Sequence, residues 1–254
     1  HGDGCRLNEN TKRLRIQHVG QIKVKLHRPT EGAIKTVSFK LEAGKWYAVV
    51  SCDLGAAPPC RKGESVGIDV GLSYFLTTST GEKVDNPRHH KASLAKLRRL
   101  QRSVSRKASK RSKRRRKAIR RLQVQYAKVR NRRKDFHHKT ARMLVDRYAF
   151  IAAEKLNIQG MLRNRRLARS IADAGWYSFL QILGSKAESA GSQVALVDPK
   201  YTSQDCSECG DRVRKPLSVR VHRCSCGCVL DRDHNAALNI AARAEPSSGK
   251  AGVT

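Results

Sequence analysis

Apolar and basic residues alternate along the first 60 residues of the chain. Residues 22–26 and 34–41 both follow a period of two, and an apolar run at 45–50 comes directly after Gly44. Alternation of this kind, interrupted by glycine turns, predicts a small antiparallel sheet or part of a barrel. The lysines on its outer face suit a solvated surface and a nucleic-acid-binding surface equally well.

Apolar runs further along the chain predict the strands of a second sheet. One run ends near Asp69, and a glycine turn separates it from a run at 74–78, so these two form a predicted hairpin. A buried strand of the parallel type ends at Glu154, and residues 194–199 predict another buried strand. Strands that alternate with helical segments indicate the α/β class.

Helical spacing of apolar residues dominates residues 90–148. It predicts two amphipathic helices joined by a basic turn at 105–117. Further helices are expected around 176–183 and from Asp233 or His234 to about Ala244.

The charge of the chain indicates a polyanionic partner. Lys and Arg number 53 and Asp and Glu only 21, which gives a formal net charge of +32 over 254 residues. This excess is far beyond what solubility requires, so nucleic acid is the expected partner. A membrane surface is the alternative, but no apolar run approaches a membrane span in length and the start of the chain shows no signal peptide.

The basic residues concentrate in the predicted helical hairpin, where Asp135 is the only acid between Arg88 and Arg142. A solvated face this one-sided would repel itself, so a phosphate-binding surface with salt-dependent affinity is the better interpretation. The residues expected to contact phosphates are Arg98, Arg99, Arg106, Lys110, Arg111, Lys113, Arg114, Arg115, Arg116, Lys117, Arg120 and Arg121.

Four of the eight cysteines have the spacing of a zinc ribbon. Cys206 and Cys209 form one Cys-x-x-Cys knuckle, and Cys224 and Cys226 with the following glycine form a Cys-x-Cys knuckle. Paired knuckles favour a structural Zn²⁺ over disulfides. Cys228 stands beside the second knuckle as a fifth cysteine, but the Cys-Gly turn favours Cys226 as the ligand.

Three acids stand at the ends of regular elements. Asp69 lies among apolar residues near the end of its strand, where a buried acid destabilises the fold unless it serves a function such as metal binding. The glycines on either side would let a metal or phosphate approach the backbone. Glu154 ends a second strand, and an acidic phrase at 231–237 follows the second cysteine knuckle. Three such carboxylates are what a two-metal phosphodiester-cleaving site requires.

These motifs together resemble one family. The chain is similar to the TnpB (OrfB) proteins of IS200/IS605-type insertion sequences, which are relatives of type V CRISPR effector nucleases. The matching segments are 67–71, 153–156, 170–176, 197–206 and 231–240.

The resemblance implies a fold and a mechanism. The fold would be an RNase H-like (RuvC) domain with an inserted basic helical hairpin and a zinc ribbon, preceded by a partial antiparallel β-barrel. Asp69, Glu154 and Asp233 match the three acidic motifs, with Asp233 preferred over Asp231 by its position in the family pattern. They would hold two Mg²⁺ ions that cleave DNA, directed by a guide RNA from the transposon end.

The expected organisation is a partial barrel at 1–60, a nuclease domain at 61–200 with its basic hairpin at 90–148, a zinc ribbon at 201–230, the last acidic motif and helix at 231–244, and a disordered tail at 245–254. Two function classes stay open. The first is a transposon-encoded RNA-guided endonuclease, acting in the cytoplasm on the nucleoid. The second is a non-cleaving DNA- or RNA-binding remnant, because the family normally has a longer N-terminal part and this chain opens on His1 rather than Met.

Overall fold

The computed structural model describes residues 4–56, 58–107, 109, 111–216 and 218–244. Its residues form two compact units. Among the described residues, the first unit comprises those within 4–56 and 99–127, and the second comprises those within 58–98 and 128–244. The tail predicted at 245–254 lies outside the described residues.

The first unit contains the antiparallel strands predicted for the N-terminal region, but they pair in two separate sheets. One sheet has the order β1-β2-β3, and the other is a hairpin of β4 and β5. The bounds are Cys5–Asn8 for β1, Arg13–Ile16 for β2, Gly20–Lys23 for β3, Ala33–Glu42 for β4 and Lys45–Asp53 for β5. The pattern at 22–26 therefore predicted a longer strand than forms, because pairing with the four-residue β2 ends at Lys23.

The basic hairpin consists of α1 (His89–Ser105) and α2 (Lys113–Arg147). The helix α2 begins inside the segment that was predicted to be a basic turn. Ser112 explains the early start, because its hydroxyl oxygen accepts a 3.1 Å hydrogen bond from the backbone N–H of Arg115, as an N-cap residue does. Lys and Arg are also good helix formers, so a run of them continues a helix that has been capped.

The second unit is built on a mixed five-stranded sheet with the order β10-β9-β6-β7-β8. The strands β6, β7 and β8 form an antiparallel meander, while β9 and β10 run parallel to β6. The bounds are Ser65–Val70 for β6, Tyr74–Thr78 for β7, Lys83–Asp85 for β8, Phe150–Glu154 for β9 and Gln193–Val197 for β10. The predicted hairpin and the parallel strand that ends at Glu154 are both present. The strand at the C-terminal edge, β10, is half exposed rather than buried, because β9 is its only neighbour in the described sheet.

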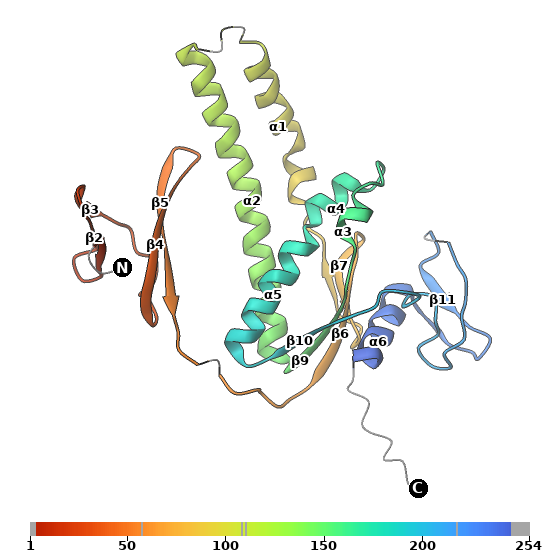
Figure 1. The fold of residues 1–254 in the computed structure, drawn as a ribbon. Coiled ribbons are helices and arrows are strands. Elements are labelled where there is room, and N and C mark those ends of the chain that lie inside the picture. The colour runs from red at the N-terminus through yellow and green to blue at the C-terminus, as the bar shows by residue number, and fades with distance from the viewer. Residues whose placement is uncertain (1–3, 57, 108, 110, 217, 245–254) are drawn as a thin grey trace. The chain divides into compact units, whose positions relative to one another are not determined.

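Helices cover both faces of this sheet (Figure 1). The C-terminal half of α2, α4 (Ala168–Ala174) and α5 (Trp176–Ala190) enclose the main apolar core with β6, β7 and β9. The opposite face of β6 carries α6 (Arg232–Ala244). The remaining elements are α3 (Ile158–Met161) and a two-stranded sheet of β11 (Val221–Arg223) and β12 (Val229–Asp231).

Within the part of the chain that the structure describes, none of the helices combines the length and the hydropathy needed to cross a membrane.

Candidate functional site

Asp69 and Glu154 occupy neighbouring strands at the same level. The strands β6 and β9 run parallel with Ile68 opposite Ala153, and the next residue on each strand is the acid. Side chains alternate between the faces of a sheet. Ile68 and Ala153 belong to the core, so Asp69 and Glu154 point to the opposite face, where α6 lies.

The third acid, Asp233, enters this face from the first turn of α6. Its Oδ2 lies close to Gly71, since a β-carbon at position 71 would be 3.9 Å from it. Its Oδ1 lies 3.5 Å from a guanidinium nitrogen of Arg220. The charges of Glu154 and Asp233 both raise the pKa of Asp69, so each of these acids lies near enough to act on Asp69 although they are distant in the sequence.

Asp231 has a different task from Asp233. Its Oδ1 accepts hydrogen bonds from the backbone N–H groups of Asp233, at 2.9 Å, and His234, at 3.3 Å. Its Oδ2 forms an ion pair with Lys83 at 2.9 Å. Burial alone would raise the pKa of Asp231, but these hydrogen bonds lower it. Asp231 therefore caps α6, and its neighbour two residues later is the acid that faces the site.

Burial makes each of the three acids reluctant to ionise, and at Asp69 the charges of the other two acids add to this effect. Burial, followed by the charges of Glu154 and Asp233, raises the pKa of Asp69 well above its usual range. Burial also raises the pKa of Glu154 and of Asp233, in spite of nearby arginines. A cluster of this kind is stabilised by protons or by a cation, and carboxylate oxygens are the ligands that Mg²⁺ prefers.

The two glycines beside Asp69 play separate parts. A β-carbon at Gly67 would come within 2.2 Å of the carbonyl oxygen of Ala237 and 2.6 Å of the backbone nitrogen of Ala241. The missing side chain of Gly67 therefore leaves room for α6 to pack against β6. The expectation that Gly67 opens the backbone to phosphate or metal is wrong. Gly71 is the glycine that borders the acids.

The four cysteines with metal-ligand spacing form one cluster. Their sulfur atoms all lie within 4.8 Å of one another. The Sγ atoms of Cys206 and Cys226 are 3.8 Å apart, and those of Cys209 and Cys224 are 3.5 Å apart. Four sulfurs bound tetrahedrally at about 2.3 Å from one ion are about 3.8 Å apart. The cluster could therefore hold a metal ion of the size of Zn²⁺.

The thiols of this cluster influence one another strongly. Burial opposes ionisation of Cys206, but hydrogen bonds from the backbone of Cys209 and Glu208 lower its pKa to about 5. A backbone hydrogen bond from Asp211 favours the thiolate of Cys209, but burial and the neighbouring thiols together raise its pKa. The thiolate of Cys206 is therefore favoured, whereas a raised pKa disfavours the thiolates of Cys209 and Cys226 unless a cation compensates their charge.

The remaining cysteines lie outside the group of four. Cys228 is buried, and its carbonyl oxygen accepts a 3.0 Å hydrogen bond from the backbone N–H of Cys224, which closes the second knuckle. Cys5, Cys52 and Cys60 are free thiols, as expected from their scattered positions.

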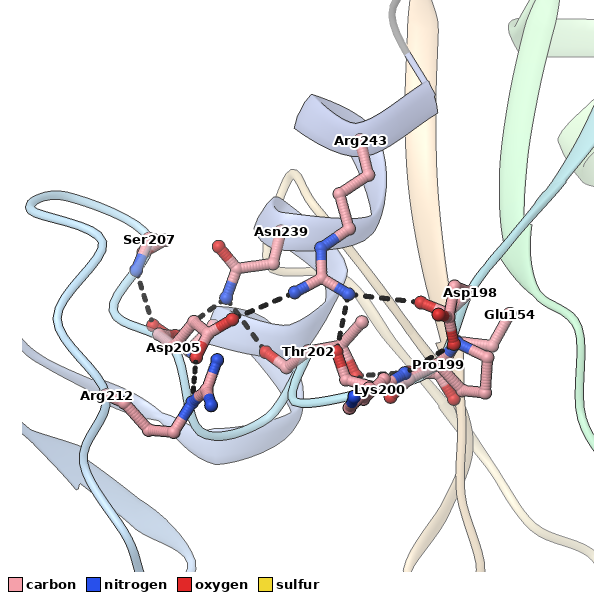
Figure 2. A network of polar contacts seen from close by, with 11 residues as sticks. Glu154, Asp198, Pro199, Lys200, Thr202, Asp205, Ser207, Arg212, Asn239 and Arg243 are labelled. Carbon is pink, nitrogen blue, oxygen red and sulfur yellow. Dashed lines mark hydrogen bonds and ion pairs between the residues drawn. The ribbon is translucent and has the colours of Figure 1, made fainter.

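A polar network joins the first knuckle to α6 (Figure 2). The side-chain amide of Asn239 donates to the carbonyl oxygens of Thr202, at 2.8 Å, and Asp205, at 2.7 Å. Arg243 donates to the carboxylate of Asp205 at 2.9 Å and to the carbonyl oxygen of Lys200 at 2.7 Å. The helix α6 thus holds the segment that leads into Cys206.

Glu154 is bound to the same segment. The Thr202 hydroxyl donates a 2.5 Å hydrogen bond to Oε1 of Glu154, and Thr202 is only 3% exposed. Sequence reasoning assigned no role to Thr202, Asp205, Asn239 or Arg243. The segments that contain Thr202, Asp205 and Asn239 carry the family resemblance, but a polar residue at a loop or helix position gives no periodic signal that would reveal its partner.

The basic residues expected to bind phosphate lie on the helical hairpin. All except Arg98 fall in the first unit. Arg115 is half buried, and Lys110 lies outside the described residues. The exposed ones are Arg98, Arg99, Arg106, Arg111, Lys113, Arg114, Arg116, Lys117, Arg120 and Arg121.

Comparison with known families decides the classification. A profile of the OrfB_IS605 family of probable transposases matches residues 36–165, about half of the chain. The chain belongs to the OrfB family of probable transposases. A second profile, the TNB domain of Cas12f1-like proteins, matches residues 176–240 of this OrfB protein and includes the cysteine cluster. The family inferred from the sequence motifs is thereby confirmed.

Individual relatives agree with this family. The chain is 40% identical over 202 residues to a Streptomyces pristinaespiralis protein named "Putative RNA-guided DNA endonuclease", covering 79% of this chain and 50% of that protein. It is 32% identical over 257 residues to "Putative RNA-guided DNA endonuclease InsQ" of Escherichia coli K12, covering 94% of this chain and 64% of that protein. The OrfB chain therefore spans about half to two thirds of the length of these curated relatives.

A solved structure shares the fold. The match is the Cas12f1-sgRNA-target DNA complex, determined by cryo-electron microscopy, with a TM-score of 0.51 and 19% sequence identity. It covers 81% of this chain and 55% of that chain.

Proposed function

We propose that this chain carries the nuclease site of a transposon-encoded RNA-guided DNA endonuclease. The observation that carries the proposal is the meeting of Asp69, Glu154 and Asp233 on one face of the sheet, from three elements distant in sequence. The sheet, in which an antiparallel meander is followed by two parallel strands, supports an RNase H-like (RuvC) domain. The names of the relatives support an RNA-guided DNA endonuclease.

The three carboxylates would hold divalent metal, with Mg²⁺ as the expected ion. Two such ions, when bound, activate a water molecule and stabilise the leaving oxygen of a phosphodiester. Glu154 and Asp69 present their carboxylates from rigid strand ends, and Asp233 does so from the capped start of α6. The neighbouring Arg220 offsets part of the negative charge before metal and substrate arrive.

The cysteine cluster would bind one structural Zn²⁺. It stands directly before β12 and α6, so an intact cluster fixes the entry into the segment that carries Asp233. Structural zinc contributes folding free energy to small metal-bound modules.

Nucleic acid would bind through the basic hairpin. Its exposed Lys and Arg residues supply the counterion-releasing contacts that dominate affinity for phosphate backbones. The guide would be an RNA from the transposon end and the target a DNA duplex, with base pairing supplying the sequence specificity. Such a protein would act on the nucleoid in the cytoplasm.

A cleavage assay tests the proposal. Purified full chain with its co-purified RNA should cut a matching DNA in the presence of Mg²⁺, and Glu154→Gln should reduce the rate by at least about a hundredfold. Glu188→Gln is the matched control, because Glu188 is exposed on α5, the helix that packs on the core face of the sheet, opposite the face of the acids. Nucleic-acid binding without metal-dependent cleavage by the unaltered chain would instead identify a binding remnant.

A further inference from the structure

The segment from Asp198 to Asp205 connects β10 to the first cysteine knuckle, and we call it the strap. The helix α6 holds it at both ends. Arg243 donates to the carbonyl oxygen of Asp198 at 3.1 Å, and Asn239 donates to that of Asp205 at 2.7 Å. Backbone carbonyl groups held by side chains of a packed helix have little freedom, so the strap is fixed relative to α6.

Thr202 lies in the middle of the strap and reaches Glu154. Its backbone carbonyl accepts a 2.8 Å hydrogen bond from Asn239, and its hydroxyl donates to Oε1 of Glu154. Among the residues that the structure describes, none donates a hydrogen bond to Oε2 of Glu154, so that oxygen can serve a cation. The Thr202 hydroxyl therefore favours the orientation of Glu154 in which Oε1 accepts its hydrogen bond and Oε2 is free to bind a cation.

We propose that Thr202 is a positioning residue for Glu154 and that Asn239 positions Thr202 in turn, so that α6 sets the orientation of an acid on β9. The proposal rests on the proposed function, in which Glu154 binds a divalent metal. The side-chain nitrogen of Asn239 donates hydrogen bonds to the carbonyl oxygens of both Thr202 and Asp205, and Asp205 directly precedes Cys206.

The size of the effect follows from what the hydroxyl does. A glutamate side chain has several rotatable bonds, and a carboxylate held by one hydrogen bond loses its preferred orientation when the donor is removed. Partners that orient metal ligands commonly contribute tenfold to a hundredfold in metal affinity. Valine matches threonine in shape but has no donor, and serine keeps the donor while losing the methyl group.

The experiment measures Mn²⁺ binding to the full chain by calorimetry, without nucleic acid, after confirming zinc content and thermal stability. Thr202→Val should weaken Mn²⁺ binding by about tenfold or more, while Thr202→Ser should stay within about threefold of the unaltered protein. Asn239→Leu removes the donor that fixes Thr202 and should weaken Mn²⁺ binding in the same direction. Ala242→Ser, an exposed change on the same helix, is the matched control and should leave binding unchanged.

The outcomes separate this proposal from the proposed function. If Glu154→Gln weakens Mn²⁺ binding but Thr202→Val does not, Thr202 is no positioning residue and the proposal is overturned while the metal site stands. If Glu154→Gln leaves Mn²⁺ binding unchanged, the proposed metal site itself fails. If Thr202→Val does not fold, Asn239→Leu decides, and unaltered Mn²⁺ affinity in that variant overturns the proposal.

Discussion

Gly67 on β6 lies directly beneath Ala237 on α6, so closely that a β-carbon at position 67 would be 2.2 Å from the carbonyl oxygen of Ala237. Both residues are buried, and α6 carries Asp233 four residues before Ala237. The approach of helix to strand thus determines how far Asp233 stands from Asp69.

Replacement of Gly67 by alanine should destabilise the fold. The close approach is to backbone, which cannot rotate away, so α6 must shift, and overpacking of this kind costs about 1–3 kcal/mol of unfolding free energy. Denaturant unfolding measures the change. Gly184→Ala is the control, since a β-carbon there meets nothing within 4 Å on the helix α5, and it should stabilise by about 0.5–1 kcal/mol. Equal stability of the two variants would contradict the close packing.

The sequence revealed those parts of the site that depend on local pattern. The apolar runs located β6 and β9, and their ends identified Asp69 and Glu154. The cysteine spacing identified four sulfurs that lie together, since a knuckle is defined by a few consecutive residues.

The parts that depend on tertiary structure could not be predicted. Nothing in the pattern distinguishes Gly67, which receives a helix, from Gly71, which borders an acid. The same holds for Thr202 and Asn239, whose roles arise only when the strap lies between α6 and β9. Strand pairing in the first unit was equally hidden, because alternation predicts that a strand exists but not which strand it joins.

Metal content should separate the four clustered cysteines from the fifth. We expect one zinc per chain, with Cys209→Ser lowering the zinc content sharply and Cys228→Ala leaving it near one, because the Cys228 thiol lies outside the group of four. Atomic emission or a chromogenic zinc assay measures this, with Cys60→Ser as the control at an exposed free thiol. Undiminished zinc in Cys209→Ser, or its loss in Cys228→Ala, would refute the ligand assignment.

The contribution of Asp69 to the stability of the protein, without added divalent cation, should decrease as the pH rises. A carboxyl group whose pKa is higher in the folded chain binds more protons when folded, so this contribution falls from the ordinary aspartate pKa of 3.8 upward, through the raised pKa of Asp69. Asp69→Asn removes this penalty and should melt at a higher temperature than the unaltered protein at pH 7.

The advantage of Asp69→Asn should shrink as the pH is lowered toward about 4, because the aspartic acid is then protonated as well. Thermal melts across this range measure it, without chelators that would strip zinc. Asp85→Asn, at an exposed acid on β8, accounts for the general effect of removing one negative charge. A melting advantage independent of pH would mean that ionisation of Asp69 is not the cause.

Neutralising the start of α2 should flatten the salt dependence of nucleic-acid binding. Each basic residue that no longer binds a phosphate lowers the slope of log affinity against log salt concentration by about one unit. Arg114, Arg115 and Arg116 replaced together by glutamine should therefore lower the slope by up to about three units. The control replaces Arg163, Arg165 and Arg166, which removes the same charge from another exposed segment. The same change of slope in both variants would indicate an effect of net charge rather than phosphate binding at α2.

The sharpest test of the acidic site compares two aspartates that are two residues apart. Asp233 faces Asp69 from the first turn of α6, whereas Asp231 accepts backbone hydrogen bonds at the start of that helix. Asparagine keeps the size of either side chain and is a good N-cap residue. Asp231→Asn should therefore preserve the cap and lose only the ion pair with Lys83, which is partly exposed and worth about 0–1 kcal/mol.

Asp233→Asn removes a charge that the proposed metal site needs. Mg²⁺-dependent cleavage should fall by at least about a hundredfold, while affinity for nucleic acid stays the same or rises, because one carboxylate fewer repels phosphate. Asp231→Asn should cleave within a few-fold of the unaltered chain. Cleavage assays and binding titrations on the two variants measure the contrast directly. If Asp231→Asn is the inactive variant and Asp233→Asn the active one, the two assignments are wrong. Asp231, which pairs with Lys83, would then be the metal ligand, and Asp233 would not.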